Sequence, residues 1–139
     1  TALLADPQVL ILDEPTAGLD PRERVRFRNI IHGLAQERTV VLSTHIVSDI
    51  EAIAGQIVFI QGGRVQVYPG SAALCAELAG MIFEMPVHVG LPSACRVLGE
   101  RERDGLTVLR VYAKQEPAGA RAVSPTLEDA FLVRYREGR

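Results

Sequence analysis

Two short apolar segments, each followed at once by polar residues, constrain the fold of this 139-residue chain more than any other feature. Residues 9–12 are followed by the letters DEP, and residues 39–42 are followed by the letters STH. Both segments are too short for a helix and lack the alternation of a half-exposed strand. They are typical of central strands in a parallel sheet that is covered on both faces. The proline at position 15 ends sheet pairing after the first segment, because it has no N–H to donate.

The segment between the two apolar runs predicts a helix that begins at Asp20. Asp20 is a suitable N-cap, Pro21 suits the first helical position, and Glu23 follows the cap by three residues. Apolar residues then recur at helical spacing and predict one buried face, at positions 27, 30, 31 and 34.

Beyond residue 45 the pattern predicts a short helix, and then strands over residues 57–60 and 64–68 joined by a glycine turn. This alternation of strands and helices is typical of an α/β domain. After residue 70 we expect a small α+β accessory region, with a hairpin at Asp104-Gly105 and strands over residues 82–89, 95–98 and 106–112. The chain is therefore predicted to have two domains, residues 1–70 and residues 71–139.

Composition and charge exclude several classes of protein. Fifteen basic and seventeen acidic residues give a formal net charge of −2, so we expect no nucleic-acid partner. The longest aliphatic runs are about four residues, far short of a membrane-spanning helix. The first residues lack a signal-peptide pattern, and the two cysteines form neither a metal pair nor a disulfide framework, which favours a reducing compartment.

Three polar side chains follow the two apolar segments and are expected to meet. The carboxyl ends of neighbouring parallel strands lie at one edge of a sheet, where ligands bind. There Asp13 can hold Mg²⁺ on the phosphates of a nucleotide, and Glu14 can deprotonate an attacking water, a role worth roughly 10²–10⁴-fold in rate. His45 can hydrogen-bond a terminal phosphate. The alternative is a strand-ending turn and a surface histidine, but three such residues after two apolar strands favour a site.

These segments resemble ABC-type ATPase domains. Residues 9–16 (VLILDEPT) resemble the Walker B motif, residues 17–20 (AGLD) the D-loop, and residues 43–45 (STH) the switch histidine segment. Residues 2–7 (ALLADP) are similar to the segment that follows the signature motif. Order and spacing agree along residues 2–70. The resemblance implies an α/β fold, the C-terminal part of a P-loop NTPase domain with mostly parallel strands.

The resemblance also implies roles and cofactors. Asp13 would help to hold Mg²⁺, Glu14 would be the catalytic base, and His45 would sense the γ-phosphate of ATP. Asp20 would lie across the interface between two such domains and couple their sites, besides capping its helix. ATP and Mg²⁺ are the implied cofactors.

Two motifs that the family needs do not occur in the 139 residues. A P-loop has the form G-x-x-x-x-G-K-[ST], yet the only lysine, Lys114, stands in the unrelated context Ala113-Lys114-Gln115. The signature motif is absent too. Because both lie upstream of Walker B in the family, we expect this chain to be the C-terminal part of a longer ATPase. By itself it should neither bind ATP tightly nor hydrolyse it.

The end of the chain narrows the expected subfamily. Residues 124–131 (SPTLEDAF) resemble the tail of many bacterial ABC-2-type exporter ATPases. This resemblance implies an ATP-hydrolysing transporter subunit that works with a second ATPase subunit, as a homodimer or a heterodimer, beneath a membrane permease subunit. Its expected location is the cytoplasm, peripheral on the cytoplasmic face of the cell membrane.

Two other functions remain open from the sequence. A soluble ABC ATPase outside transport would predict a second cassette or a basic arm, and neither occurs in the chain. A non-catalytic interaction module that has lost its P-loop is the other alternative. Such an idle site would have no need to keep Asp13, Glu14 and His45 together.

Overall fold

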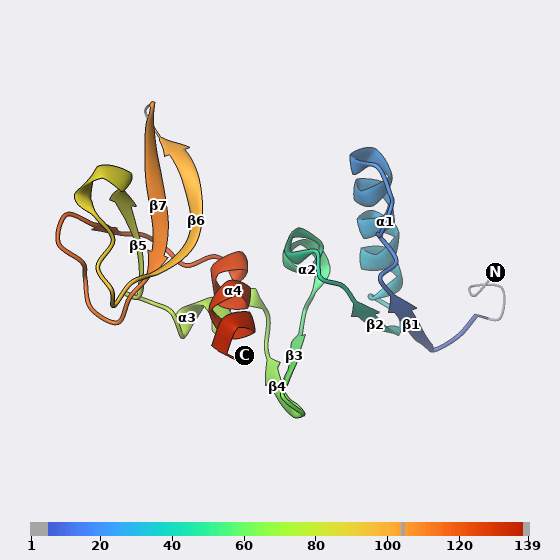
Figure 1. Ribbon diagram of the computed structural model, residues 1–139. Helices are drawn as coiled ribbons and strands as arrows, with labels where there is room; N and C mark the ends of the chain where they lie inside the picture. Colours follow the sequence, from blue (N-terminus) through green and yellow to red (C-terminus); the bar gives the residue numbers. More distant parts are fainter. Residues whose placement is uncertain (1–5, 104, 138–139) are drawn as a thin grey trace. The chain divides into compact units, whose positions relative to one another are not determined.

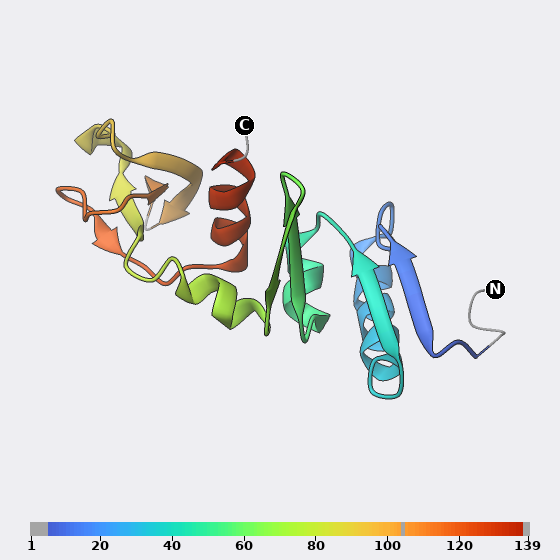
Figure 2. The ribbon, with the colours of Figure 1, turned by 90° about the horizontal axis from the view of Figure 1, so that it is seen from below.

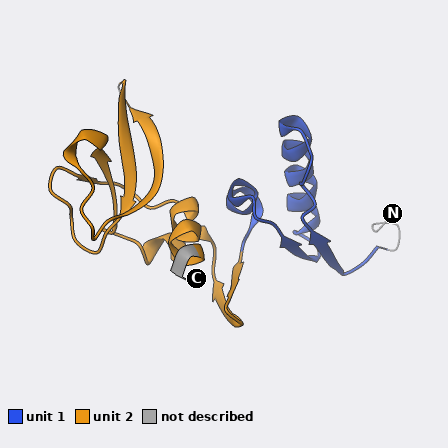
Figure 3. Cartoon of the chain, in the orientation of Figure 1, with its two compact units in different colours: residues 1–55 blue, residues 56–139 orange. Residues whose placement is uncertain are grey.

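The computed structural model describes residues 6–103 and 105–137 (Figure 1). Its contacts divide the chain into two compact units, residues 1–55 and residues 56–139 (Figure 3). Along the described residues, no helix combines the length and the apolar character that crossing a membrane requires.

The first unit is built on a parallel pair of strands, β1 (Val9–Asp13) and β2 (Thr39–Ser43). Helix α1 (Pro21–Leu34) makes the crossover that two parallel strands need, and α2 (Val47–Ile53) follows β2 (Figure 2). The pairing runs in register from Val9 opposite Thr39 to Asp13 opposite Ser43. The two strands therefore end side by side.

A capping box confirms the predicted start of α1. The Asp20 Oδ1 atom accepts hydrogen bonds from the backbone N–H groups of Arg22 and Glu23, each at 2.8 Å. The Glu23 carboxylate accepts one from the Asp20 N–H at 3.4 Å. These bonds satisfy N–H groups that no helical carbonyl can reach. On the predicted apolar face Ile31 is buried but Ile30 is 49% exposed, so that face is covered only in part.

The expectation that β1 and β2 are covered on both faces is wrong for the described residues. Leu10 is buried, whereas Val9, Ile11 and Val41 are 55%, 74% and 51% exposed. Successive side chains of a strand point to opposite faces. In the described part of the first unit, α1 covers one face of the pair (Figure 2). The exposed side chains of Val9, Ile11 and Val41 share the other face, as the register and the alternation along a strand require.

The second unit begins with a hairpin of β3 (Ile57–Gln61) and β4 (Arg64–Tyr68). Gly62 and Gly63 form the predicted two-residue turn, with φ values of +54° and +73° that favour glycine. Helix α3 (Ser71–Ala76) then leads to an antiparallel sheet of order β6-β7-β5-β8, and α4 (Leu127–Glu137) follows it. The sheet and its 3₁₀ turn comprise β5 (Ile82–Pro86), η2 (Val87–Val89), β6 (Arg96–Arg103), β7 (Leu106–Tyr112) and β8 (Arg121–Ala122).

The expectation of mostly parallel strands is also wrong. Among the strand pairs of the described residues, β1–β2 is parallel and the others are antiparallel. A two-residue turn can only join antiparallel strands, which decides the direction of β4. The strand expected over residues 82–89 ends at Pro86, because proline cannot continue the ladder. Asp104 of the predicted hairpin lies outside the described residues, but β6 and β7 on either side of it do pair.

Side chains of α4 hold the β3–β4 hairpin in the second unit. Phe131 packs edge-on against Phe59, with ring centroids 6.3 Å apart. The Arg134 guanidinium lies 5.7 Å from the Phe59 ring and 5.1 Å from the Tyr68 ring, and it donates to Gln66 Oε1 at 2.6 Å. The compact units therefore divide between residues 55 and 56, while the functional boundary expected after residue 70 stays a prediction.

A buried ion pair joins β7 to α4, on the face of β7 opposite the core side chains of Leu109 and Val111. Arg110 and Asp129 are 5% and 2% exposed, and Arg110 donates to the two Asp129 oxygens at 2.7 and 2.6 Å. Arg110 also donates to Glu84 Oε1 and to the Ser124 carbonyl, while Asp129 accepts from the N–H and the hydroxyl of Thr126. The core itself contains Phe83, Met85, Leu109, Val111 and Ala113.

Both members of this pair stay charged. Burial by itself raises the pKa of the Asp129 carboxyl, but hydrogen bonds from Arg110 and Thr126, with the charge of Arg110, lower that pKa below its usual value. The hydrogen bond to Asp129 raises the pKa of Arg110 against the effect of burial. Removing one partner therefore leaves an uncompensated buried charge.

We expect Arg110→Met to lower the free energy of unfolding of the second unit by about 3–5 kcal/mol, because it strands the Asp129 carboxylate. All three tyrosines lie in this unit and the chain has no tryptophan, so tyrosine fluorescence during urea unfolding reports the loss. Arg101→Met, on the exposed part of β6, is the matched control and should change stability by less than about 0.5 kcal/mol. Equal effects of the two variants would contradict the assignment.

Candidate functional site

The ends of β1 and β2 bring the predicted polar residues to one edge of the parallel pair. Asp13 is opposite Ser43 in the last register position. The chain remains paired one residue further, because the Glu14 N–H donates to the Ser43 carbonyl at 3.0 Å. Glu14 directly follows β1, and His45 lies two residues after Ser43, the last residue of β2. Both residues therefore lie at the same edge of the parallel pair.

Glu14 and His45 are in contact. The His45 backbone N–H donates to Glu14 Oε1 at 3.1 Å, and His45 Nδ1 lies 3.0 Å from Glu14 Oε2. The Glu14 side chain is 38% exposed and that of His45 is 72% exposed. The half-buried Glu14 carboxylate is held by its contacts with His45, and the exposed His45 imidazole is accessible to a bound molecule. Such a pair can exchange protons with that molecule.

The backbone of Glu14 adopts an unusual conformation. Its φ is +44°, in the left-handed region that residues other than glycine rarely adopt. Such conformations cost of order 1–3 kcal/mol and persist where surrounding hydrogen bonds hold them. Here the Glu14 N–H is bonded to β2, and the Glu14 carbonyl accepts from the Ala17 N–H at 3.1 Å. The turn after β1 thus directs the Glu14 side chain toward the His45 loop.

Asp13 is exposed and is held by a neighbour that the sequence analysis gave no role. The Ser43 hydroxyl donates to Asp13 Oδ1, and its oxygen also lies 3.3 Å from the Glu14 N–H, which donates to it. The available signal was the position of Ser43, at the end of the second apolar segment. Only the register of the strands shows that this position is opposite Asp13.

Asp20 is a helix cap in this structure. Its carboxylate is engaged by the first backbone N–H groups of α1, not by Glu14 or His45. The structure therefore brings together Asp13, Glu14 and His45 and leaves Asp20 at the start of α1. The expected role of Asp20 between two domains stays a prediction.

The Asp13 carboxylate at this edge can supply one oxygen ligand to Mg²⁺. This ion takes oxygen ligands in near-octahedral geometry and usually keeps several waters, and Asp13 offers an exposed carboxylate. The residues that the structure describes contain no group of three or more His, Cys, Asp or Glu side chains arranged for a metal. Asp13 can thus contribute to an ion whose other ligands are phosphate and water oxygens.

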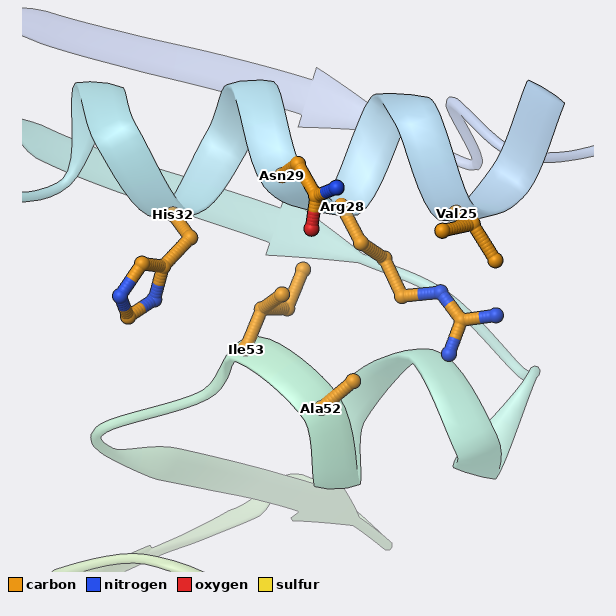
Figure 4. Close-up of a pocket in the computed structure, with 6 residues that line it drawn as sticks. All are labelled: Val25, Arg28, Asn29, His32, Ala52 and Ile53. Atoms are coloured by element: carbon orange, nitrogen blue, oxygen red, sulfur yellow. The ribbon is translucent and has the colours of Figure 1, made fainter. Parts of the chain in front are cut away.

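A groove of about 320 Å³ lies elsewhere in the first unit, between α1 and α2 (Figure 4). Figure 4 shows Arg28 and His32 extending from α1 toward α2, with Ile53 reaching back. The Arg28 Nε atom lies 3.5 Å from Oδ1 of the fully buried Asp49, so this charge pair helps to pack the two helices. Asp13, Glu14 and His45 are not among the residues that line the groove.

Comparison with known proteins finds relatives that are named as ATP-binding proteins. No model of a known protein family matches it. Among individual proteins, it is 39% identical over 94 residues to ATP-binding cassette sub-family A member 9 of Mus musculus, an alignment covering 68% of this chain and 6% of that protein. It is 47% identical over 66 residues to the bacitracin transport ATP-binding protein BcrA of Bacillus licheniformis, an alignment covering 46% of this chain and 22% of that protein.

The Nod factor export ATP-binding protein I of Rhizobium leguminosarum bv. viciae is 43% identical over an alignment of 151 positions. That alignment covers 94% of this chain and 47% of the relative, so the chain spans less than half of the length of that protein. The relatives include export ATP-binding proteins, which confirms the resemblance noted in the sequence. The chain is therefore homologous to the ATP-binding proteins of ABC transporters and matches them in the nucleotide-binding domain of that family.

Proposed function

We propose that this chain supplies the C-terminal part of an ATP-binding and ATP-hydrolysing subunit of an ABC transporter, of the ABC-2 export type. The observation that carries the proposal is the meeting of Glu14 and His45 beside Asp13, at the end of two parallel strands. The names of two relatives, which refer to bacitracin transport and Nod factor export, support a role in transport.

In this proposal each residue of the edge has one task. Glu14 accepts a proton from the water whose oxygen attacks the γ-phosphorus, while the bond from phosphorus to the bridging oxygen breaks and ADP leaves with that oxygen. His45 donates a hydrogen bond to the γ-phosphate and so responds to its presence. Asp13 is the residue that would hold Mg²⁺, and the bound ion supplies charge neutralisation on the phosphates.

The proposal assigns partners as well. Residues 1–70 belong to the ATPase domain and residues 71–139 form an accessory region of the same subunit. A second ATPase subunit faces the first, with Asp20 and its neighbours at the interface. A separate membrane permease subunit carries the transported molecule, so the ATPase acts on the cytoplasmic face of the membrane.

We expect the coding sequence upstream of Thr1 to contain, in frame, a P-loop and a signature motif. Without a P-loop the lysine and backbone amides that hold the phosphates are missing, and the 139 residues contain neither motif. Sequencing the source DNA upstream of the Thr1 codon tests this prediction. A start codon immediately ahead of Thr1 would contradict the ATPase proposal and favour a non-catalytic interaction module.

In the full-length protein, Glu14→Gln should lower ATP hydrolysis by at least about 10²-fold, because the amide cannot accept the proton from water. ATP binding should persist, since the amide keeps the size of the side chain, and the closed dimer should accumulate with ATP. Phosphate release measures the first effect and size-exclusion chromatography with ATP the second. Glu37→Gln, at an exposed position after α1, is the matched control. Normal hydrolysis by Glu14→Gln would exclude Glu14 as the base.

His45→Ala should lower hydrolysis by about 10²-fold while changing the dissociation constant of ATP far less, because the imidazole contributes one donor to a charge that grows during reaction. The two quantities are measured by phosphate release and by equilibrium binding of a fluorescent ATP analogue. His32→Ala, in the groove of Figure 4, removes the same type of side chain away from this edge. If both histidine variants hydrolyse ATP like the wild type, His45 has no part in the chemistry.

A further inference from the structure

We propose that Ser43 is a positioning residue of this site, whose hydroxyl fixes the Asp13 carboxylate and the Glu14 backbone at the same time. The inference rests on the function proposed above, because it concerns how the edge of β1 and β2 is prepared for Mg²⁺ and ATP. It is carried by the contacts of one side chain that bridges the two strands.

A serine hydroxyl can both donate and accept hydrogen bonds, and the side chain of Ser43 does both. Its O–H donates to Asp13 Oδ1, and its oxygen accepts from the Glu14 N–H at 3.3 Å. The Ser43 carbonyl accepts from the same N–H at 3.0 Å. One residue of β2 thus holds the two consecutive acidic residues that follow β1.

The effect on Asp13 is to select one orientation of its carboxylate. A hydroxyl that donates to a carboxylate makes a charge-assisted hydrogen bond, which is stronger than a neutral one. Asp13 is exposed, and with Oδ1 engaged in this way its other oxygen, Oδ2, is the one left to bind a cation. The hydroxyl therefore lowers the number of orientations that the carboxylate must lose when it binds an ion.

The effect on Glu14 is on its backbone. The left-handed φ of +44° is unfavourable for glutamate, and the bonds from the Glu14 N–H to Ser43 oppose a return to ordinary strand geometry. That conformation is the one in which the Glu14 carboxylate reaches the N–H and Nδ1 of His45. Ser43 therefore acts on Glu14 as well as on Asp13 without touching the reacting atoms.

The neighbouring hydroxyls differ from Ser43 in what they contact. Thr44 Oγ1 accepts from the Ile46 N–H at 3.0 Å and stabilises the turn before α2. Ser48 lies exposed on α2. Ser48→Ala is therefore a control that removes the same group elsewhere in the same unit. Because Ser43 is itself exposed, alanine at this position leaves no buried cavity.

The experiment compares Ser43→Ala, Ser43→Thr, Ser43→Val and Ser48→Ala in the full-length protein. Binding of Mn²⁺, which replaces Mg²⁺ and is detected by electron paramagnetic resonance, is titrated in the presence of a non-hydrolysable ATP analogue. Hydrogen exchange of the Glu14 amide is followed by mass spectrometry. Threonine and valine have the same shape and differ only in the hydroxyl group, so this pair separates positioning from packing.

We expect Ser43→Ala and Ser43→Val to weaken Mn²⁺ binding about tenfold, because both lose the charge-assisted bond to Asp13. Both should also speed exchange of the Glu14 amide, because both lose the hydroxyl oxygen that accepts from it. Ser43→Thr should restore both quantities to within about threefold, since it keeps the hydroxyl and suits a strand. Ser48→Ala should behave like the wild type.

The outcomes separate this inference from the proposed function. If the wild type binds the ATP analogue and Mn²⁺ but Ser43→Val binds Mn²⁺ as tightly as Ser43→Thr, Ser43 has no positioning role and the proposed function stands. Should the folded wild type bind neither the analogue nor Mn²⁺, the proposed function itself fails. Loss of Mn²⁺ binding in the threonine variant as well would show a packing effect and overturn the inference.

Discussion

The in-register parallel pairing of β1 with β2 is the constraint on which the candidate site depends. It places Asp13 opposite Ser43. The next backbone hydrogen bond, from the Glu14 N–H to the Ser43 carbonyl, fixes where the chain leaves each of the two strands. A slip of one residue would turn every side chain of a strand to the opposite face. It would then separate Asp13 from Ser43, and Glu14 from His45, although no side chain had changed. The chemistry of this edge is therefore decided by the register of two five-residue strands.

That register is specified on one face of the pair only. Leu10 is buried, while Val9, Ile11 and Val41 on the opposite face remain more than half exposed. The described part of the first unit thus obtains its hydrophobic stabilisation from one face, although apolar side chains occupy both. Hydrogen bonds at the strand ends, from Ser43 to Asp13 and from Glu14 to Ser43, add directional constraints where the apolar contacts do not discriminate.

Local signals in the sequence predicted the parts of the fold whose physics is local. The N-cap at Asp20 and the glycine turn at Gly62 depend on neighbouring residues, and both occur where expected. The same glycine turn makes β3 and β4 antiparallel, so the expectation of mostly parallel strands overlooked a local signal that was present in the sequence. Among site residues, Glu14 and His45 followed from position after an apolar strand. Ser43 did not, because its role exists only once its partner across the sheet is known.

The tail that suggested an exporter subfamily has a structural explanation of its own. Within residues 124–131, Thr126 and Asp129 cap the start of α4 reciprocally, and Asp129 also pairs with Arg110. A sequence that satisfies these bonds needs a hydroxyl and a carboxylate three residues apart, whatever the protein does. The tail therefore bears on ancestry and on the stability of the second unit. The proposed ATP chemistry rests instead on the first unit, where the two acidic residues after β1 and the histidine after β2 lie together at the end of one parallel pair.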